Sequence, residues 1–286
     1  MKNYVFFLML LLVPHLMSAQ EQKFLAEQFI QQGDTLNYRI LYPEGYSDDK
    51  EYPLVLFLHG AGERGNDNKA QLTHGSGLFI ENTEYPAIVL FPQCPKDDYW
   101  ANIESTYSED GKRNFHFKAA KEPTNALSLA MGLLDQMLGS GNVKKDQVYV
   151  GGLSMGGMGT FELLARRPNT FAAAIPICGG GDPDTADSYA GNTELWIFHG
   201  AKDDVVPSEL SIEMANAINK AGGVASLTIY GNANHNSWDP TFAEPDLLNW
   251  LFSKRLELEI KNQRLPRYMN HSSHWLARVQ ILNIEW

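Results

Sequence analysis

Positive charge and cysteine are both scarce in this sequence. Its 286 residues carry 23 lysines and arginines against 34 aspartates and glutamates, a formal net charge of −11. An acidic chain without a basic stripe does not attract nucleic acid or an anionic membrane surface, so we exclude both as partners. The two cysteines, Cys94 and Cys178, each follow a strand-like apolar run. We expect buried free thiols, although an exported chain could join them in a disulfide.

The N-terminal apolar run is also shorter than a membrane-spanning helix requires. Val5 to Val13 is apolar, Lys2 precedes it, and the small residues Ser18 and Ala19 follow it. This pattern is typical of a signal peptide over residues 1–20, with a buried N-terminal helix as the alternative. We therefore expect an exported protein, either periplasmic or secreted.

Apolar runs of strand length alternate with helical periodicity through the rest of the chain. The predicted strands cover 36–42, 52–58, 88–91, 147–151, 171–177, 195–198 and 227–230. The predicted helices cover 126–138, 160–167, 209–221 and 242–252. This order predicts one α/β domain over residues 21–255, with a mostly parallel central sheet and helices on both faces.

The two ends of that domain are less informative. Residues 21–35 are expected to form a lead-in to the first strand. Residues 256–286 are an extension of unknown role, either a peripheral helix with a strand or a disordered segment.

The stretch Gly152-Leu153-Ser154-Met155-Gly156 reads G-x-S-x-G and lies between a predicted strand and a predicted helix. That context is the one a nucleophile elbow requires, because the glycines permit a sharp, strained turn that exposes the serine. An ordinary strand-to-helix loop is the alternative. We therefore predict Ser154 as a nucleophile.

A second glycine-rich segment, His59-Gly60-Ala61-Gly62, follows the strand that ends at Leu58. Acyl transfer builds negative charge on a carbonyl oxygen, and two preorganised backbone N–H groups commonly stabilise it. We predict that Ala61 and Met155 supply these groups as an oxyanion hole. The alternative is a glycine turn with a structural histidine.

Carboxylates and an imidazole follow two later strands. Asp203 and Asp204 come after 195–198, and His235 comes after 227–230. A histidine that titrates near neutrality suits general-base catalysis, and a carboxylate can orient it. The residues alone leave open which aspartate does so. The other candidates considered are turn residues (Asp182, Asp184, Asp187), loop-shaping histidines (His59, His199) and rival bases (His74, His116).

Three aromatic residues are candidate walls of a substrate pocket. They are Trp100, Trp238 and Phe115. Packing in the core is an equally open alternative for all three.

Four segments together carry a family resemblance. They are Leu58 to Gly65, Gly152 to Gly157, Phe198 to Pro207, and His235 to Trp238. The chain resembles α/β-hydrolases of the bacterial phospholipase/carboxylesterase and polyhydroxybutyrate-depolymerase-like esterase group. This group includes feruloyl-esterase-like members and is often labelled predicted peptidase. The resemblance covers about residues 36–255.

The resemblance implies an α/β-hydrolase fold and a triad in the order Ser154, Asp203, His235. The family motif H-G-x-x-D-x-V-V-P matches Asp203 rather than Asp204. No metal and no organic cofactor are implied. We expect a serine esterase acting on small acyl esters or on feruloyl or acetyl polysaccharide esters. A prolyl-oligopeptidase-like serine peptidase and a non-catalytic binding protein are the alternatives.

Overall fold

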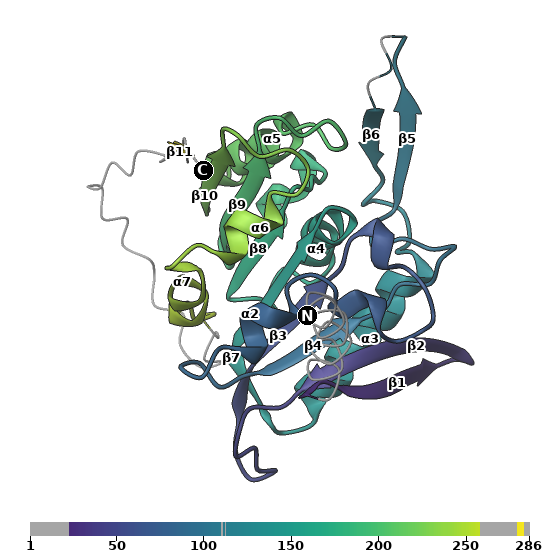
Figure 1. Cartoon of the computed structure of the whole chain (residues 1–286), viewed down its shortest axis with the longest axis vertical. Helices are drawn as coiled ribbons and strands as arrows, with labels where there is room; N and C mark the ends of the chain where they lie inside the picture. Colours follow the sequence, from purple (N-terminus) through teal and green to yellow (C-terminus); the bar gives the residue numbers. More distant parts are fainter. Residues whose placement is uncertain (1–22, 110, 112, 258–278, 283–286) are drawn as a thin grey trace, which may run out of the picture.

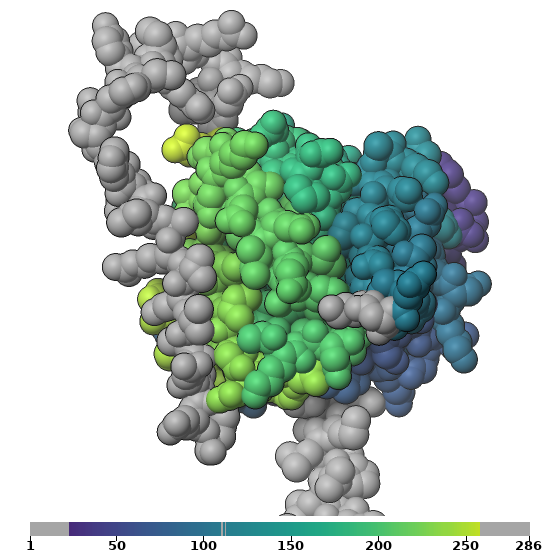
Figure 2. All heavy atoms as spheres, turned by 90° about the horizontal axis from the view of Figure 1, so that it is seen from above, coloured from purple at the N-terminus to yellow at the C-terminus, as the bar shows by residue number. Residues whose placement is uncertain are grey.

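The computed structural model describes residues 23–109, 111, 113–257 and 279–282 (Figure 1). The expected signal peptide and most of the C-terminal extension lie outside these residues. Within them, no helix is long and apolar enough to cross a membrane. Seen from above, the N-terminal half of the described chain (purple and blue) and its C-terminal half (green) lie side by side (Figure 2).

A nine-stranded sheet runs through the centre of the molecule, in the order β1-β2-β4-β3-β7-β8-β9-β10-β11. Its strands are β1 (Leu25–Gln31), β2 (Asp34–Leu41), β3 (Tyr52–Leu58), β4 (Ile88–Pro92), β7 (Val143–Leu153), β8 (Ala173–Ile177), β9 (Glu194–Gly200), β10 (Val224–Tyr230) and β11 (Val279–Leu282). Each pair from β4 to β11 is parallel, whereas β1–β2 and β2–β4 are antiparallel. The mostly parallel sheet is therefore confirmed.

Helices cover both faces of the sheet, as the alternation of elements predicts. They are α2 (Ser76–Ile80), α3 (Asn125–Gly139), α4 (Met155–Arg166), α5 (Glu209–Lys220), α6 (Trp238–Phe242) and α7 (Leu247–Ser253). Leu54 and Leu56 of β3 pack in one buried cluster with α3, α4 and α5. Val55 and Phe57 face a second cluster that includes residues of α2 and α7. Successive strand residues therefore serve two separate cores.

Three sequence expectations need correction. The expected lead-in contains β1, which pairs with β2 at the edge of the sheet. The helix predicted over 242–252 begins only at Leu247, as α7; Phe242 ends the preceding helix α6, and Pro245 lies between the two. The hairpin of β5 (Ile103–Tyr107) and β6 (Arg113–Phe117) was not predicted, since β5 is polar and largely exposed. This hairpin projects from the body of the molecule (Figure 1).

The N-terminus of α4 is wedged between the ends of β3 and β8. A Cβ atom on Gly156 would lie 1.9 Å from the carbonyl oxygen of Leu58. A Cβ atom on Gly157 would lie 2.6 Å from the carbonyl oxygen of Ile177. Both obstacles are backbone atoms that cannot move aside easily. Glycine is therefore required at these two positions, where the helix begins against the sheet.

Replacing Gly156 with alanine should therefore destabilise the fold by about 3 kcal/mol or more, because the added methyl group meets a sheet carbonyl. Urea unfolding of the variant measures this loss. Gly139→Ala is the matched control, because Gly139 ends α3 and nothing lies within 4 Å of its added Cβ. Equal stabilities for the two variants would contradict the wedged arrangement.

His59 anchors the loop that follows β3. Its side chain is buried; Nδ1 lies 2.6 Å from the carbonyl oxygen of Gly60, and Nε2 accepts a hydrogen bond from the N–H of Cys94 at 2.9 Å. This pairing fixes a neutral ring with its hydrogen on Nδ1. Burial lowers the pKa of His59 to about 4; the bond to Gly60 opposes this shift, and the charge of Arg64 adds to it. The neutral imidazole ties this loop to the end of β4.

This histidine should make stability depend on pH. Between its ordinary pKa of about 6.5 and its folded value, only the unfolded chain takes up the proton, so stability falls as pH falls. The wild type should lose about 2 kcal/mol from this source between pH 7 and 5, and His59→Gln should not. Urea unfolding at the two pH values tests this, with His116→Gln, an exposed histidine, as control. Parallel pH dependence in wild type and His59→Gln would refute it.

Candidate active site

Ser154 occupies the single-residue turn between β7 and α4. Its backbone has φ 54° and ψ −116°, a left-handed conformation that is strained for a residue with a side chain. Its N–H donates to the carbonyl oxygen of Ile177 at 2.8 Å. A Cβ atom on Gly152 would lie 2.5 Å from the carbonyl oxygen of Gly156. The turn is therefore closed tightly, and it leaves the serine partly exposed.

One imidazole joins the serine to a carboxylate. His235 Nε2 lies 2.9 Å from Ser154 Oγ, and His235 Nδ1 lies 2.8 Å from Asp203 Oδ2. The three residues follow β7, β9 and β10, so the carboxyl ends of parallel strands bring them together. The histidine side chain is 20% exposed, whereas the carboxylate side chain is fully buried. The structure thus assembles Ser154, His235 and Asp203 into a hydrogen-bonded chain.

The carboxyl group of Asp203 is held in its ionised form although its side chain is not exposed to solvent. Burial raises the pKa of its carboxyl group, but hydrogen bonds from His199, from His235 and from the N–H of Val206 outweigh burial and hold that pKa well below its usual range. Its Oδ1 accepts from the N–H groups of Val205 and Val206, each at 2.9 Å. The carboxylate can therefore accept a hydrogen bond from the N–H at Nδ1 of His235. The other ring nitrogen, Nε2, then has no hydrogen and can accept a hydrogen bond from the Ser154 hydroxyl.

The structure also settles which aspartate faces the imidazole. Asp204 is exposed, and its N–H donates to Asn234 Oδ1 at 3.2 Å. Asp203 is the one that contacts His235. The rival bases have other polar partners: His116 Nε2 lies 3.3 Å from Thr106 Oγ1 on the hairpin, and His74 Nε2 lies 3.8 Å from Glu63.

The two predicted oxyanion donors lie on segments that contact each other. Met155 is the first residue of α4, where backbone N–H groups have no partner within the helix. Ala61 begins a 3₁₀ turn over Ala61–Glu63. A Cβ atom on Gly60 would lie 2.8 Å from Leu153 Cδ1, so this loop packs on the residue before the serine. Arg64 fixes the loop by donating to the carbonyl oxygens of Ala61 and Asp98, both at 3.1 Å.

The three aromatic residues proposed as pocket walls differ in where they lie. Trp238 begins α6, and its ring centroid lies 5.5 Å from that of His235 and 5.1 Å from that of His74. Trp100 is fully buried and packs on His59, so its prediction as a pocket wall is corrected to a core position. Phe115 is mostly buried in the middle of β6, opposite Ser105, and it lines a groove of about 730 Å³ together with Asp203.

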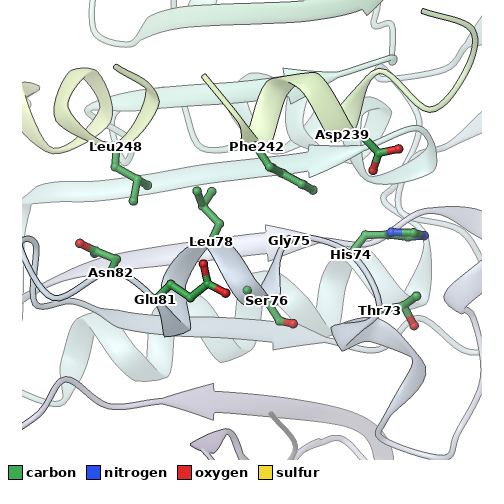
Figure 3. Close-up of a pocket in the computed structure, with 11 residues that line it drawn as sticks. Thr73, His74, Gly75, Ser76, Leu78, Glu81, Asn82, Asp239, Phe242 and Leu248 are labelled. Atoms are coloured by element: carbon green, nitrogen blue, oxygen red, sulfur yellow. The ribbon is translucent and has the colours of Figure 1, made fainter. Parts of the chain in front are cut away.

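A groove missed by the sequence reasoning lies beyond Trp238, between α2 and α6, with a volume of about 520 Å³. Leu248 and Phe242 lie along one side of it and Leu78 and Glu81 along the other, and His74 and Asp239 lie at one end (Figure 3). Its lining residues come from two segments far apart in the chain, so no local motif could identify it. They are Thr73, His74, Gly75, Ser76, Gly77, Leu78, Glu81, Asn82, Asp239, Phe242 and Leu248.

Cys94 and Cys178 are buried free thiols, as expected. The Cys178 sulfur, a carboxylate oxygen of Asp203 and a ring nitrogen of His235 lie within 4.8 Å of one another. Burial raises the pKa of the Cys178 thiol, and the other two groups already bond each other. We therefore interpret Cys178 as packing beneath the hydrogen-bonded chain rather than as a metal ligand.

Comparisons with known proteins point to one family of esterases. The model of the phospholipase/carboxylesterase family matches residues 46–244. A bifunctional acetylxylan esterase/xylanase of Neocallimastix patriciarum is 34% identical over 154 residues, which cover 54% of this chain and 20% of that protein. A probable feruloyl esterase C of Aspergillus terreus is 23% identical over 204 residues, which cover 70% of this chain and 66% of that protein.

Solved structures agree on the fold. The crystal structure of a thermostable esterase has a TM-score of 0.73 at 33% identity and covers 83% of this chain and 64% of that one. An acylaminoacyl peptidase has a TM-score of 0.54 at 15% identity, covers 82% of this chain and 41% of that one, and shows the fold alone. The fold and family expected from the sequence are confirmed: this chain has the α/β-hydrolase fold and belongs to the phospholipase/carboxylesterase family.

Proposed function

We propose that this protein is a serine carboxylic-ester hydrolase. The observation that carries the proposal is the hydrogen-bonded chain from Ser154 through His235 to Asp203. A serine whose hydroxyl faces an imidazole that a buried carboxylate orients is the arrangement of an activated nucleophile. The esterase names of its relatives support the same chemistry.

The proposed reaction runs in two halves. His235 Nε2 takes the proton of Ser154 Oγ as that oxygen attacks the ester carbonyl carbon, and Asp203 stabilises the imidazolium. The N–H groups of Ala61 and Met155 donate to the oxyanion. His235 then gives its proton to the departing alcohol, which leaves an acyl group on Ser154. A water molecule, deprotonated by His235, cleaves that acyl-enzyme and regenerates the serine.

The proposed substrates are small acyl esters or acetyl and feruloyl esters of polysaccharides. Relatives named as an acetylxylan esterase and a feruloyl esterase support this class. Trp238 lies against His235 and offers an aromatic wall where a substrate could stack. The signal-like residues 1–20 support export, which would bring the enzyme to polymers outside the cell.

Two other functions remain to be tested against this one. A serine peptidase would use the same three residues, but the similarity to an acylaminoacyl peptidase is one of fold alone. A non-catalytic binding protein would have no need for a nucleophile, base and acid held within hydrogen-bond distance. Esterase activity therefore explains the geometry best.

Ser154→Ala should lower ester hydrolysis by at least about 10⁴-fold, because the acyl-enzyme can no longer form. The assay compares nitrophenyl acetate, butyrate and octanoate, methyl ferulate and a peptide anilide. Ser188→Ala, an exposed serine on another segment, is the matched control and should keep the full rate.

Labelling by a fluorophosphonate separates the remaining functions. Cleavage of the anilide alone would indicate a peptidase. An unlabelled Ser154 together with no turnover of any substrate would indicate a binding protein.

Trp238→Ala should affect an aromatic acyl group more than a small one, since only the former can stack on the indole. We expect kcat/KM to fall about tenfold further for 4-nitrophenyl ferulate than for 4-nitrophenyl acetate. The two esters share a leaving group, so the difference reports the acyl side. Trp250→Ala, on α7 against Trp196, is the control. An equal loss on both esters would show that Trp238 supports His235 rather than the substrate.

A further inference from the structure

A second imidazole contacts the carboxylate of Asp203. His199 lies in β9 and is fully buried, with Nε2 3.2 Å from Asp203 Oδ2 and 2.9 Å from the carbonyl oxygen of Val206. Its Nδ1 lies 2.7 Å from Ser211 Oγ, in α5. Ser211 Oγ also lies 3.0 Å from the carbonyl oxygen of Gly179, so its one hydrogen can point either to that oxygen or to Nδ1. The sequence indicated only a loop-shaping residue at this position.

The partners of His199 fix where its hydrogen lies. Both neighbours of Nε2, a carbonyl oxygen and a carboxylate oxygen, can only accept. Nε2 must therefore carry a hydrogen, whichever way the Ser211 hydroxyl turns. The one hydrogen on Nε2 is shared between the carbonyl oxygen of Val206 at 2.9 Å and Asp203 Oδ2 at 3.2 Å. Oδ2 of Asp203 thus faces two imidazoles, while Oδ1 accepts from two backbone N–H groups. Three hydrogen bonds and the longer contact from His199 therefore reach the buried carboxylate.

We propose that His199 is a positioning residue that sets the basicity of His235 through Asp203. Its Nε2–H holds Oδ2 in place and draws part of the negative charge that would otherwise face His235. Less charge on Oδ2 stabilises the His235 imidazolium less. This inference rests on the proposed esterase function, because it assigns His235 as the base.

The titratable groups near Asp203 come from several elements, and Arg113, His116, Asp204 and Glu209 line a groove together with it. Of these groups, Asp203 is the one that the His199 ring contacts. His235 faces Asp203 from the segment after β10, and Cys178 faces it from the end of β8. The helix packed against His199, α5, contributes the uncharged hydroxyl of Ser211. A change in the titration of His235 on substitution of His199 is therefore transmitted by Asp203.

The test compares two substitutions of similar size. His199→Met removes the N–H donor, whereas His199→Gln keeps a donor at about the position of Nε2. In His199→Met, kcat/KM for 4-nitrophenyl acetate should fall about tenfold, the usual effect of losing a hydrogen bond to a charged group. The acid limb of its pH profile should also move to higher pH, because more negative charge then faces the imidazolium. His199→Gln should recover most of both.

Two controls separate positioning from packing. Thr193→Val removes a buried hydrogen bond to the carbonyl oxygen of Phe171, just before β9, and should lower the melting temperature without moving the acid limb. If His199→Met does not fold, Ser211→Ala removes the partner of Nδ1 and should move the limb in the same direction by less.

NMR titration of the His235 ring reports the same shift without turnover. An upward shift in His199→Met that is absent in His199→Gln supports the proposal. If wild type and His199→Met share one acid limb and one His235 titration, His199 only fills space and the proposal is wrong. Should Ser154→Ala keep its activity, the proposed function fails, while the NMR titration still decides the role of His199.

Discussion

The close approach of α4 to the end of β3 is the constraint on which the site depends. The chain must turn from a central strand into a helix within one residue, and the helix must begin almost on the backbone of Leu58. Glycine at 152, 156 and 157 permits that approach, and the strain is concentrated at Ser154. The Ser154 hydroxyl makes no capping hydrogen bond to α4 and lies against His235 instead. The contacts of α4 with the ends of β3 and β8 therefore hold the serine at this position.

Burial of Asp203 is the second constraint, because an ion without water must find its hydrogen bonds in the protein. Backbone N–H groups of the following turn satisfy one oxygen, and two imidazoles satisfy the other. This arrangement holds the carboxylate charged and leaves one orientation for His235. The same groups that stabilise the buried charge thus also aim the imidazole at Ser154.

The sequence predicted those parts of the molecule that depend on local pattern. The strand, the G-x-S-x-G turn and the helix around Ser154 follow from periodicity and glycine placement, and the structure has them there. The strands β1 and β5 were missed because edge and hairpin strands are exposed and lack an apolar run. Trp100 was placed in a pocket although it is in the core, since an aromatic side chain suits either place.

The residues alone did not decide between neighbouring candidates for one role, although the family motif favoured Asp203. Asp203 and Asp204 are neighbours of identical chemistry, and the residues alone left both open. Only the fold shows that one is buried against two histidines while the other faces solvent. The same holds for His199, whose ring nitrogens meet partners from the turn after β9 and from α5.

The loops that carry Asp203 and His235 are joined directly to each other. Asn234 Oδ1 accepts from the N–H groups of Asp204 and His235, and the N–H of Lys202 donates to the carbonyl oxygen of Ala233. A Cβ atom on Gly200 would lie 2.2 Å from the carbonyl oxygen of Asn234, so the two backbones are in contact. Backbone contacts therefore set the distance between Asp203 and His235. Under the proposed esterase function, a substrate would not have to assemble this pair, and its binding energy would be available to place its carbonyl carbon at Ser154 Oγ.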